Sequence, residues 1–166
     1  MFQQLDQFCT WLQNTPFSLM IASIAWIIPA LQTIHILSIA LVISSAFLLH
    51  LRLLGLAGGA QPPAAVARRF LPFIWGPLPV LLVTGAVLIS AEPARSLENP
   101  SFALKMALLL TAIGVTLLYQ WKLAAAPDYW EATGTRRVAV KLIAVLSLAL
   151  WTGIVLAGRW IAYTQP

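Results

Sequence analysis

Long apolar runs separated by short polar stretches dominate this chain. Four of the runs are long enough to cross a bilayer as helices, which takes about 20 residues. We place these spans near residues 30–54, 70–91, 102–123 and 138–163. The pattern predicts an all-α integral membrane protein whose core is an antiparallel bundle of four transmembrane helices.

A further apolar run, residues 17–28, precedes the first span with no turn sequence between them. The two runs together are far longer than one crossing of about 30 Å requires. Pro29 is the expected break, because proline removes a backbone donor and clashes with the preceding turn. We therefore predict that residues 2–28 form two short interfacial helices, broken at Asn14-Thr15-Pro16. Two tryptophans suit that position, Trp11 and Trp26.

Prolines and glycines also mark the spans. The second span contains Pro72, Pro77 and Pro79, which predict a kinked, tightly packed helix, because its neighbours must satisfy the freed carbonyls. Small residues near mid-span let helices approach closely; they are Gly85, Gly114 and Gly153. The Gly58-Gly59 pair predicts a helix stop and turn after the first span.

The basic residues indicate the topology. Most Lys and Arg residues fall in the first and third connections, around residues 52–69 and 122–141, whereas the second, around 92–105, is balanced by acids. In the third connection, Asp128 and Glu131 are expected to form a solvated turn. Because cytoplasmic loops carry an excess of Lys and Arg, we expect both termini outside the cytoplasm. In a bacterium, that places the chain in the inner membrane with periplasmic termini.

Composition agrees with a membrane protein. The 166 residues, which we expect to form one domain, are 60% hydrophobic and only 9% charged. The net charge of +5 is scattered over the ends of the apolar runs, so it predicts contact with lipid and not with nucleic acid. Cys9 is the only cysteine, which excludes an internal disulfide.

Three nitrogen-bearing side chains are expected at one membrane depth. His35 lies a few residues into the first span, Lys105 enters the third span from the same side, and Arg159 lies near that end of the fourth. Uncompensated, these groups would repel one another and be costly to desolvate. Haem b would compensate them, with its iron bound by His35 and its propionates by Lys105 or Arg159. Alternatively, Lys105 and Arg159 snorkel to the headgroups, and His35 bonds to a backbone carbonyl.

The second histidine, His50, lies about 22 Å from His35 along one helix, so the two cannot bind one iron. The spacing is similar to that of paired histidines in di-haem cytochromes b, which makes His50 a second candidate haem ligand. Because His50 adjoins Arg52, we expect it at the interface, in contact with water or lipid phosphate. Two nitrogen ligands on one iron would then require a homo-oligomer or an amine such as Lys105.

Two motifs carry a family resemblance. The run Ile34-His-Ile-Leu-Ser-Ile-Ala-Leu with Leu51-Arg-Leu-Leu-Gly-Leu resembles a signature of an uncharacterised family of small bacterial inner-membrane proteins. So does the later Thr84-Gly with Asn99-Pro-Ser-Phe-Ala-Leu-Lys105. Histidine in the first span and lysine opening the third also resemble the HemJ-type protoporphyrinogen oxidases. That resemblance implies a haem b protein with His35 and Lys105 at essential positions. The chain departs from the pattern because its later helices contain no histidine.

Several functions remain open from the sequence. The first is a haem b-binding electron-transfer protein or redox subunit that passes electrons between quinone and a periplasmic partner. The second is an enzyme of porphyrinogen oxidation. The third is a non-redox protein, either an accessory subunit of a larger membrane complex or a small transporter.

Overall fold

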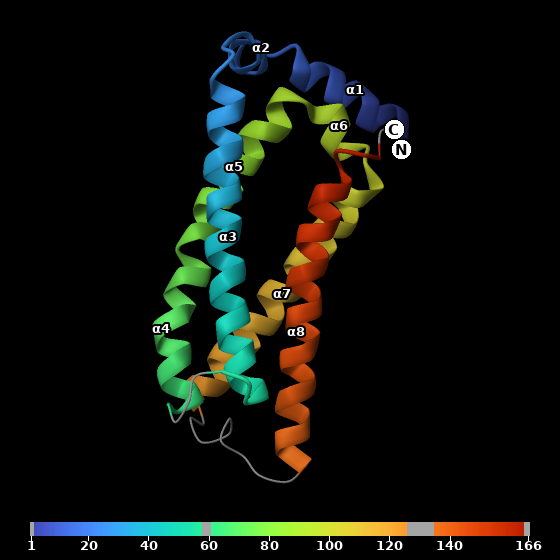
Figure 1. The fold of residues 1–166 in the computed structure, drawn as a ribbon. Helices are drawn as coiled ribbons and strands as arrows, with labels where there is room; N and C mark the ends of the chain where they lie inside the picture. The colour runs from blue at the N-terminus through green and yellow to red at the C-terminus, as the bar shows by residue number, and fades with distance from the viewer. Residues whose placement is uncertain (1, 58–60, 126–134, 165–166) are drawn as a thin grey trace.

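The computed structural model describes residues 2–57, 61–125 and 135–164, and all regular structure in these ranges is helical (Figure 1). The helices are α1 (Phe2–Gln13), α2 (Pro16–Ser23), α3 (Ile27–Leu54), α4 (Pro63–Trp75), α5 (Pro77–Ala91), α6 (Pro93–Leu97), α7 (Pro100–Ala125) and α8 (Thr135–Trp160). Four crossings are long and apolar enough to span a membrane: α3, α4 with α5, α7, and α8. The predicted fold class, a four-helix membrane bundle with short N-terminal helices, is confirmed.

The N-terminal helices lie across one end of the bundle, which we call the terminal end because both chain termini are there (Figure 1). α2 begins as predicted after Asn14-Thr15, where Thr15 Oγ1 accepts a hydrogen bond from Ser18 N (3.3 Å). The chain breaks again at residues 24–26. The break before the first span is therefore present, but it precedes Pro29, which lies in the first turn of α3. A proline there removes no helical hydrogen bond.

α3 ends at Gly55, which has a φ of 81°. This left-handed conformation favours glycine, and it lets Leu56 N donate to Leu51 O (2.9 Å). The helix stop therefore lies before the predicted Gly58-Gly59 turn. That turn lies outside the described residues, as does the predicted turn at Asp128 and Glu131.

The second crossing is broken at its middle, as its prolines predict. α4 and α5 meet at Gly76, whose N–H donates to Pro72 O (2.8 Å). A Cβ at Gly76 would lie 3.0 Å from that same carbonyl oxygen, so the joint leaves little room for a side chain. The helical crossing begins at Pro63, seven residues before the predicted start.

The bundle packs around α3, which contacts α4, α5 and α8, while α7 packs mainly against α8. The buried apolar core lies mostly in the half away from the terminal end; its members include Val42, Ala46, Leu49, Val66, Ile74, Leu123 and Ala144. Gly153 allows a close helix contact, because a Cβ there would lie 3.2 Å from Leu108 Cδ1. The same prediction for Gly114 is wrong, since a Cβ there would meet nothing within 4 Å.

Candidate functional site

His35 is the half-buried histidine of α3, about 12 Å below the start of that helix. Its Nδ1 lies 2.7 Å from Oγ1 of Thr84 on α5. Thr84 is 5% exposed, and its hydroxyl donates to Val80 O at 2.7 Å. The alternative that His35 bonds to a backbone carbonyl is wrong, because its partner is a side-chain hydroxyl on a neighbouring helix.

The two hydrogen bonds of Thr84 form together in only one tautomer of His35. A hydroxyl carries one hydrogen, and a carbonyl oxygen only accepts, so the hydrogen of Thr84 goes to Val80 O when both bonds are made. Thr84 Oγ1 therefore accepts from His35, so Nδ1 carries the ring proton and Nε2 keeps its lone pair. A neutral imidazole in this state offers Nε2 as a metal ligand or hydrogen-bond acceptor.

Gly85 lies beside the same imidazole. A Cβ at Gly85 would sit 3.5 Å from His35 Cε1, which is ordinary van der Waals contact. The absence of a larger side chain lets α5 approach α3 at the level of the ring.

Lys105 approaches this site from α7. Its half-buried side chain lies along Gly158 of α8, where a Cβ would be 3.5 Å from Lys105 Cδ and 3.7 Å from Nζ. The charge of Lys105 is close enough to act electrostatically on the His35 ring. Within the described ranges, the only ion pair joins Arg95 to Glu92 (2.7 Å), so no described carboxylate neutralises Lys105.

Arg159, the third predicted member, is directed elsewhere. Its side chain is exposed, and Nη2 donates to Tyr163 Oη at 3.1 Å. The guanidinium carbon also lies 5.4 Å from the centre of the Tyr163 ring. The structure therefore brings Lys105 towards His35 but pairs Arg159 with Tyr163, and a propionate contact for Arg159 stays a prediction.

His50 is buried, contrary to the expected contact with water or lipid phosphate. It is 5% exposed, and its Nδ1 donates to Ala46 O in its own helix. Arg52, the residue behind that expectation, lies 200° further round the helix and donates to Gln61 O (2.7 Å). No group of three His, Cys, Asp or Glu residues that could hold a metal occurs among the described residues.

Asn99 organises the terminal end, a role that the sequence did not reveal. It is 1% exposed, and its Nδ2 donates to the carbonyls of Ile161 (3.3 Å) and Thr164. Its Oδ1 accepts from Ser101 N (2.9 Å) and Thr164 Oγ1 (3.1 Å). Because residues 161–164 turn to meet Asn99, α8 ends at Trp160, before the predicted end at residue 163.

Cys9 of α1 is buried beside Glu98, just after α6. Burial, and then the charge and hydrogen bonding of Glu98, raise the pKa of the Cys9 thiol above its ordinary value. The thiol is therefore held neutral, which makes it a poor nucleophile and a poor metal ligand.

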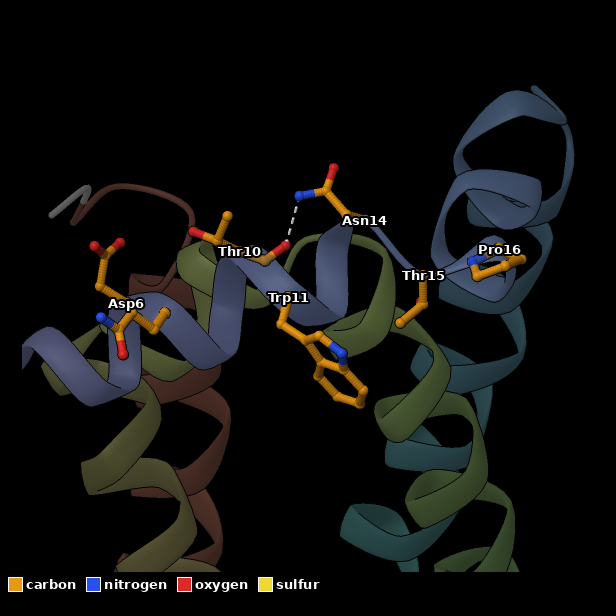
Figure 2. A pocket seen from close by; sticks show the side chains of 7 residues that line it. Asp6, Thr10, Trp11, Asn14, Thr15 and Pro16 are labelled. Carbon is orange, nitrogen blue, oxygen red and sulfur yellow. Dashed lines mark hydrogen bonds between the residues drawn. The ribbon is translucent and has the colours of Figure 1, made fainter.

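An open hollow of about 710 Å³ lies along α1 (Figure 2). Its lining includes Asp6, Thr10, Trp11 and Asn14. Asn14 Nδ2 donates to Thr10 O (2.8 Å), and the Trp11 indole points away from the side of α1 that carries Asp6 and Asn14. The hollow includes none of the predicted site residues.

These features define a helical membrane protein of four crossings, with a histidine and a lysine in one half of the bundle. The chain belongs to DUF6644, a family of unknown function that matches residues 13–164. Comparisons with curated proteins and with solved structures gave no match.

Proposed function

We propose that this protein binds haem b and acts in the membrane as an electron-transfer protein or redox subunit. The supporting observation is the hydrogen bond between His35 Nδ1 and Thr84 Oγ1, because it leaves Nε2 as a ligand nitrogen. Histidines that bind metals almost always donate their other ring N–H to an oxygen in this way. Imidazole is also the usual protein ligand of haem iron in globins and peroxidases.

The described residues would supply one imidazole ligand and one cation to the haem. His35 would bind the iron, and Lys105 would neutralise a propionate or supply a second nitrogen ligand. His50 is about 22 Å away along α3 and would not share that iron. Bound haem would supply one-electron chemistry, while this chain would orient the imidazole and shield the group from water.

The partners and location follow from the same proposal. We propose a bacterial inner membrane location with both termini in the periplasm, and exchange of electrons with quinone or a periplasmic partner. A periplasm-dependent reporter fused after Pro166 should then be active, and a cytoplasm-dependent one inactive. The reverse result would refute this topology, which rests on the Lys and Arg asymmetry of the connections.

The optical spectrum of protein purified from haem-sufficient cells tests haem binding. We expect a Soret band, and an α-band after reduction. His35→Ala should abolish both, whereas the matched variant His50→Ala should keep most of the haem if it folds. A colourless wild-type protein, or a His35→Ala variant with a wild-type spectrum, would refute the proposal. Porphyrinogen turnover by the purified protein would instead favour the oxidase function.

A second candidate function is that of a non-redox accessory subunit. The observation that favours it is the exposure of α7, because only 11% of the most apolar stretch of this helix is buried inside the protein. Its large exposed side chains include Leu104, Leu110, Leu117 and Trp121. Colourless protein that co-purifies with a larger membrane complex would support this function.

A further inference from the structure

Two polar side chains of α8 are buried without a hydrogen-bond partner in the described part of the chain. Ser147 is 0% exposed and Trp151 is 2% exposed. Neither Ser147 Oγ nor Trp151 Nε1 has a partner there. The indole N–H can only donate, so Trp151 needs an acceptor.

The two side chains occupy one face of α8. They are four residues apart, which makes them neighbours on the helix surface. Gly158, where Lys105 lies, is seven residues beyond Trp151 and falls on the same stripe. The Ser147–Trp151 pair therefore continues, towards mid-membrane, the α8 face that Lys105 contacts.

Trp151 lies deeper in the bundle than His35. It is about 13.5 Å from the terminal end of α8, and that end already lies well below the start of α3 (Figure 1). α3 and α8 pack against each other, and Trp151 belongs to the core that contains Val42 of α3. The unpartnered donors therefore face the interior of the bundle and not the lipid.

A polar donor in this environment requires an acceptor, because the bilayer interior supplies none. Burial of the two side chains limits the size of the acceptor. The neighbours Leu150 and Ile154 are also buried, each 8% exposed, so a bulky lipophilic molecule would have to displace the core. Water is small enough, and it can accept from the indole while exchanging a second hydrogen bond with the serine hydroxyl.

We propose that Ser147 and Trp151 bind an internal water molecule inside the bundle. This site does not depend on haem binding, since neither residue belongs to the His35–Lys105 site. It places a polar group deeper in the bundle than His35, within an otherwise apolar contact of α8.

Solid-state NMR of the full chain in lipid vesicles tests the site. With ¹⁵N-tryptophan labelling, we expect magnetisation transfer from water to the Trp151 indole N–H, assigned by the loss of its signal in Trp151→Phe. Exposed Trp160 serves as the positive reference. Ser147→Ala should lower the transfer rate at least two-fold, whereas Ser90→Ala, at a partly exposed serine of α5, should leave it unchanged.

Each outcome decides the proposal. Absence of transfer from water to the wild-type Trp151 indole would overturn it. Transfer from lipid protons instead of water would also overturn it and would identify a lipid as the acceptor. If Trp151→Phe fails to fold, through-bond assignment of the wild-type indole gives the same answer without a variant.

Discussion

Replacing Thr84 with valine removes the hydroxyl that links His35 to α5 while keeping the shape of the side chain. Two hydrogen bonds are lost, each of 2.7 Å. The bond to Val80 O contributes little, because that carbonyl keeps its helical N–H partner. The bond from His35 carries most of the effect, because its loss leaves a half-buried ring N–H without an acceptor.

The expected loss of stability can be estimated from measured hydrogen bonds of buried and interhelical groups. An unsatisfied buried donor costs about 1–3 kcal/mol in soluble proteins, whereas hydrogen bonds between membrane helices average about 0.6 kcal/mol and reach about 1.7 kcal/mol. His35 is only half-buried, so we expect Thr84→Val to lower the free energy of unfolding by about 1 kcal/mol. That change is roughly a five-fold shift in the unfolding equilibrium constant.

A double-mutant cycle with His35→Phe isolates the pair, with unfolding measured in mixed micelles by circular dichroism. ¹⁵N NMR of the imidazole supplies a second measurement, because protonated and bare ring nitrogens differ in chemical shift. Thr84→Ser should keep the Nδ1–H tautomer, and Thr84→Val should lose it. A coupling energy below about 0.3 kcal/mol, together with an unchanged tautomer in Thr84→Val, would refute the assigned hydrogen bond.

Three further perturbations test other parts of the structure. Asn99→Ala should lower the free energy of unfolding by about 2 kcal/mol, because it strands buried groups in the C-terminal segment, and an unfolding curve equal to wild type would contradict this role. Gly158→Ala should be neutral or stabilising by about 0.5 kcal/mol, whereas Gly158→Leu should cost about 1–3 kcal/mol by crowding Lys105; equal stabilities would count against that contact. Cys9 should react slowly with maleimide at neutral pH until the protein unfolds. Because folding raises the pKa of Cys9, its stabilising contribution should be complete below the ordinary pKa of about 8.5 and decline as pH rises through the folded-state pKa; a flat alkaline stability profile would contradict this.

The four crossings could be predicted from the sequence because lipid admits few alternatives. An apolar run of about 20 residues must satisfy its backbone internally, so it forms a helix. The residues at which the helices begin and end were less predictable. α4 begins before Arg68 and Arg69, whose charges indicate a loop when the sequence is read alone. Both residues fit in the helix because long Arg side chains carry their charged groups to water. α8 ends where Asn99 captures residues 161–164, a contact that requires the folded bundle.

The approach of Lys105 to His35 follows from antiparallel threading, since each residue enters its span from the same side. The rotation of each helix about its axis does not follow from threading. That rotation turns His35 towards Thr84 and buries His50, although the nearby Arg52 is partly exposed. Depth was therefore predictable from position along the chain, but the partner of each polar group was not.

The two histidines differ in how their rings are held. Both donate from Nδ1, but His50 bonds within its own helix among core residues, so its bond fixes nothing between helices. His35 bonds across to α5 in the half nearer the terminal end, where the core contributes fewer residues. The bond to Thr84 orients the His35 ring relative to α5 as well as α3, whereas the bond to Ala46 orients the His50 ring relative to α3 alone. His35 is also half-buried, whereas His50 is 5% exposed, so the His35 ring is the more accessible of the two to the ligand proposed above.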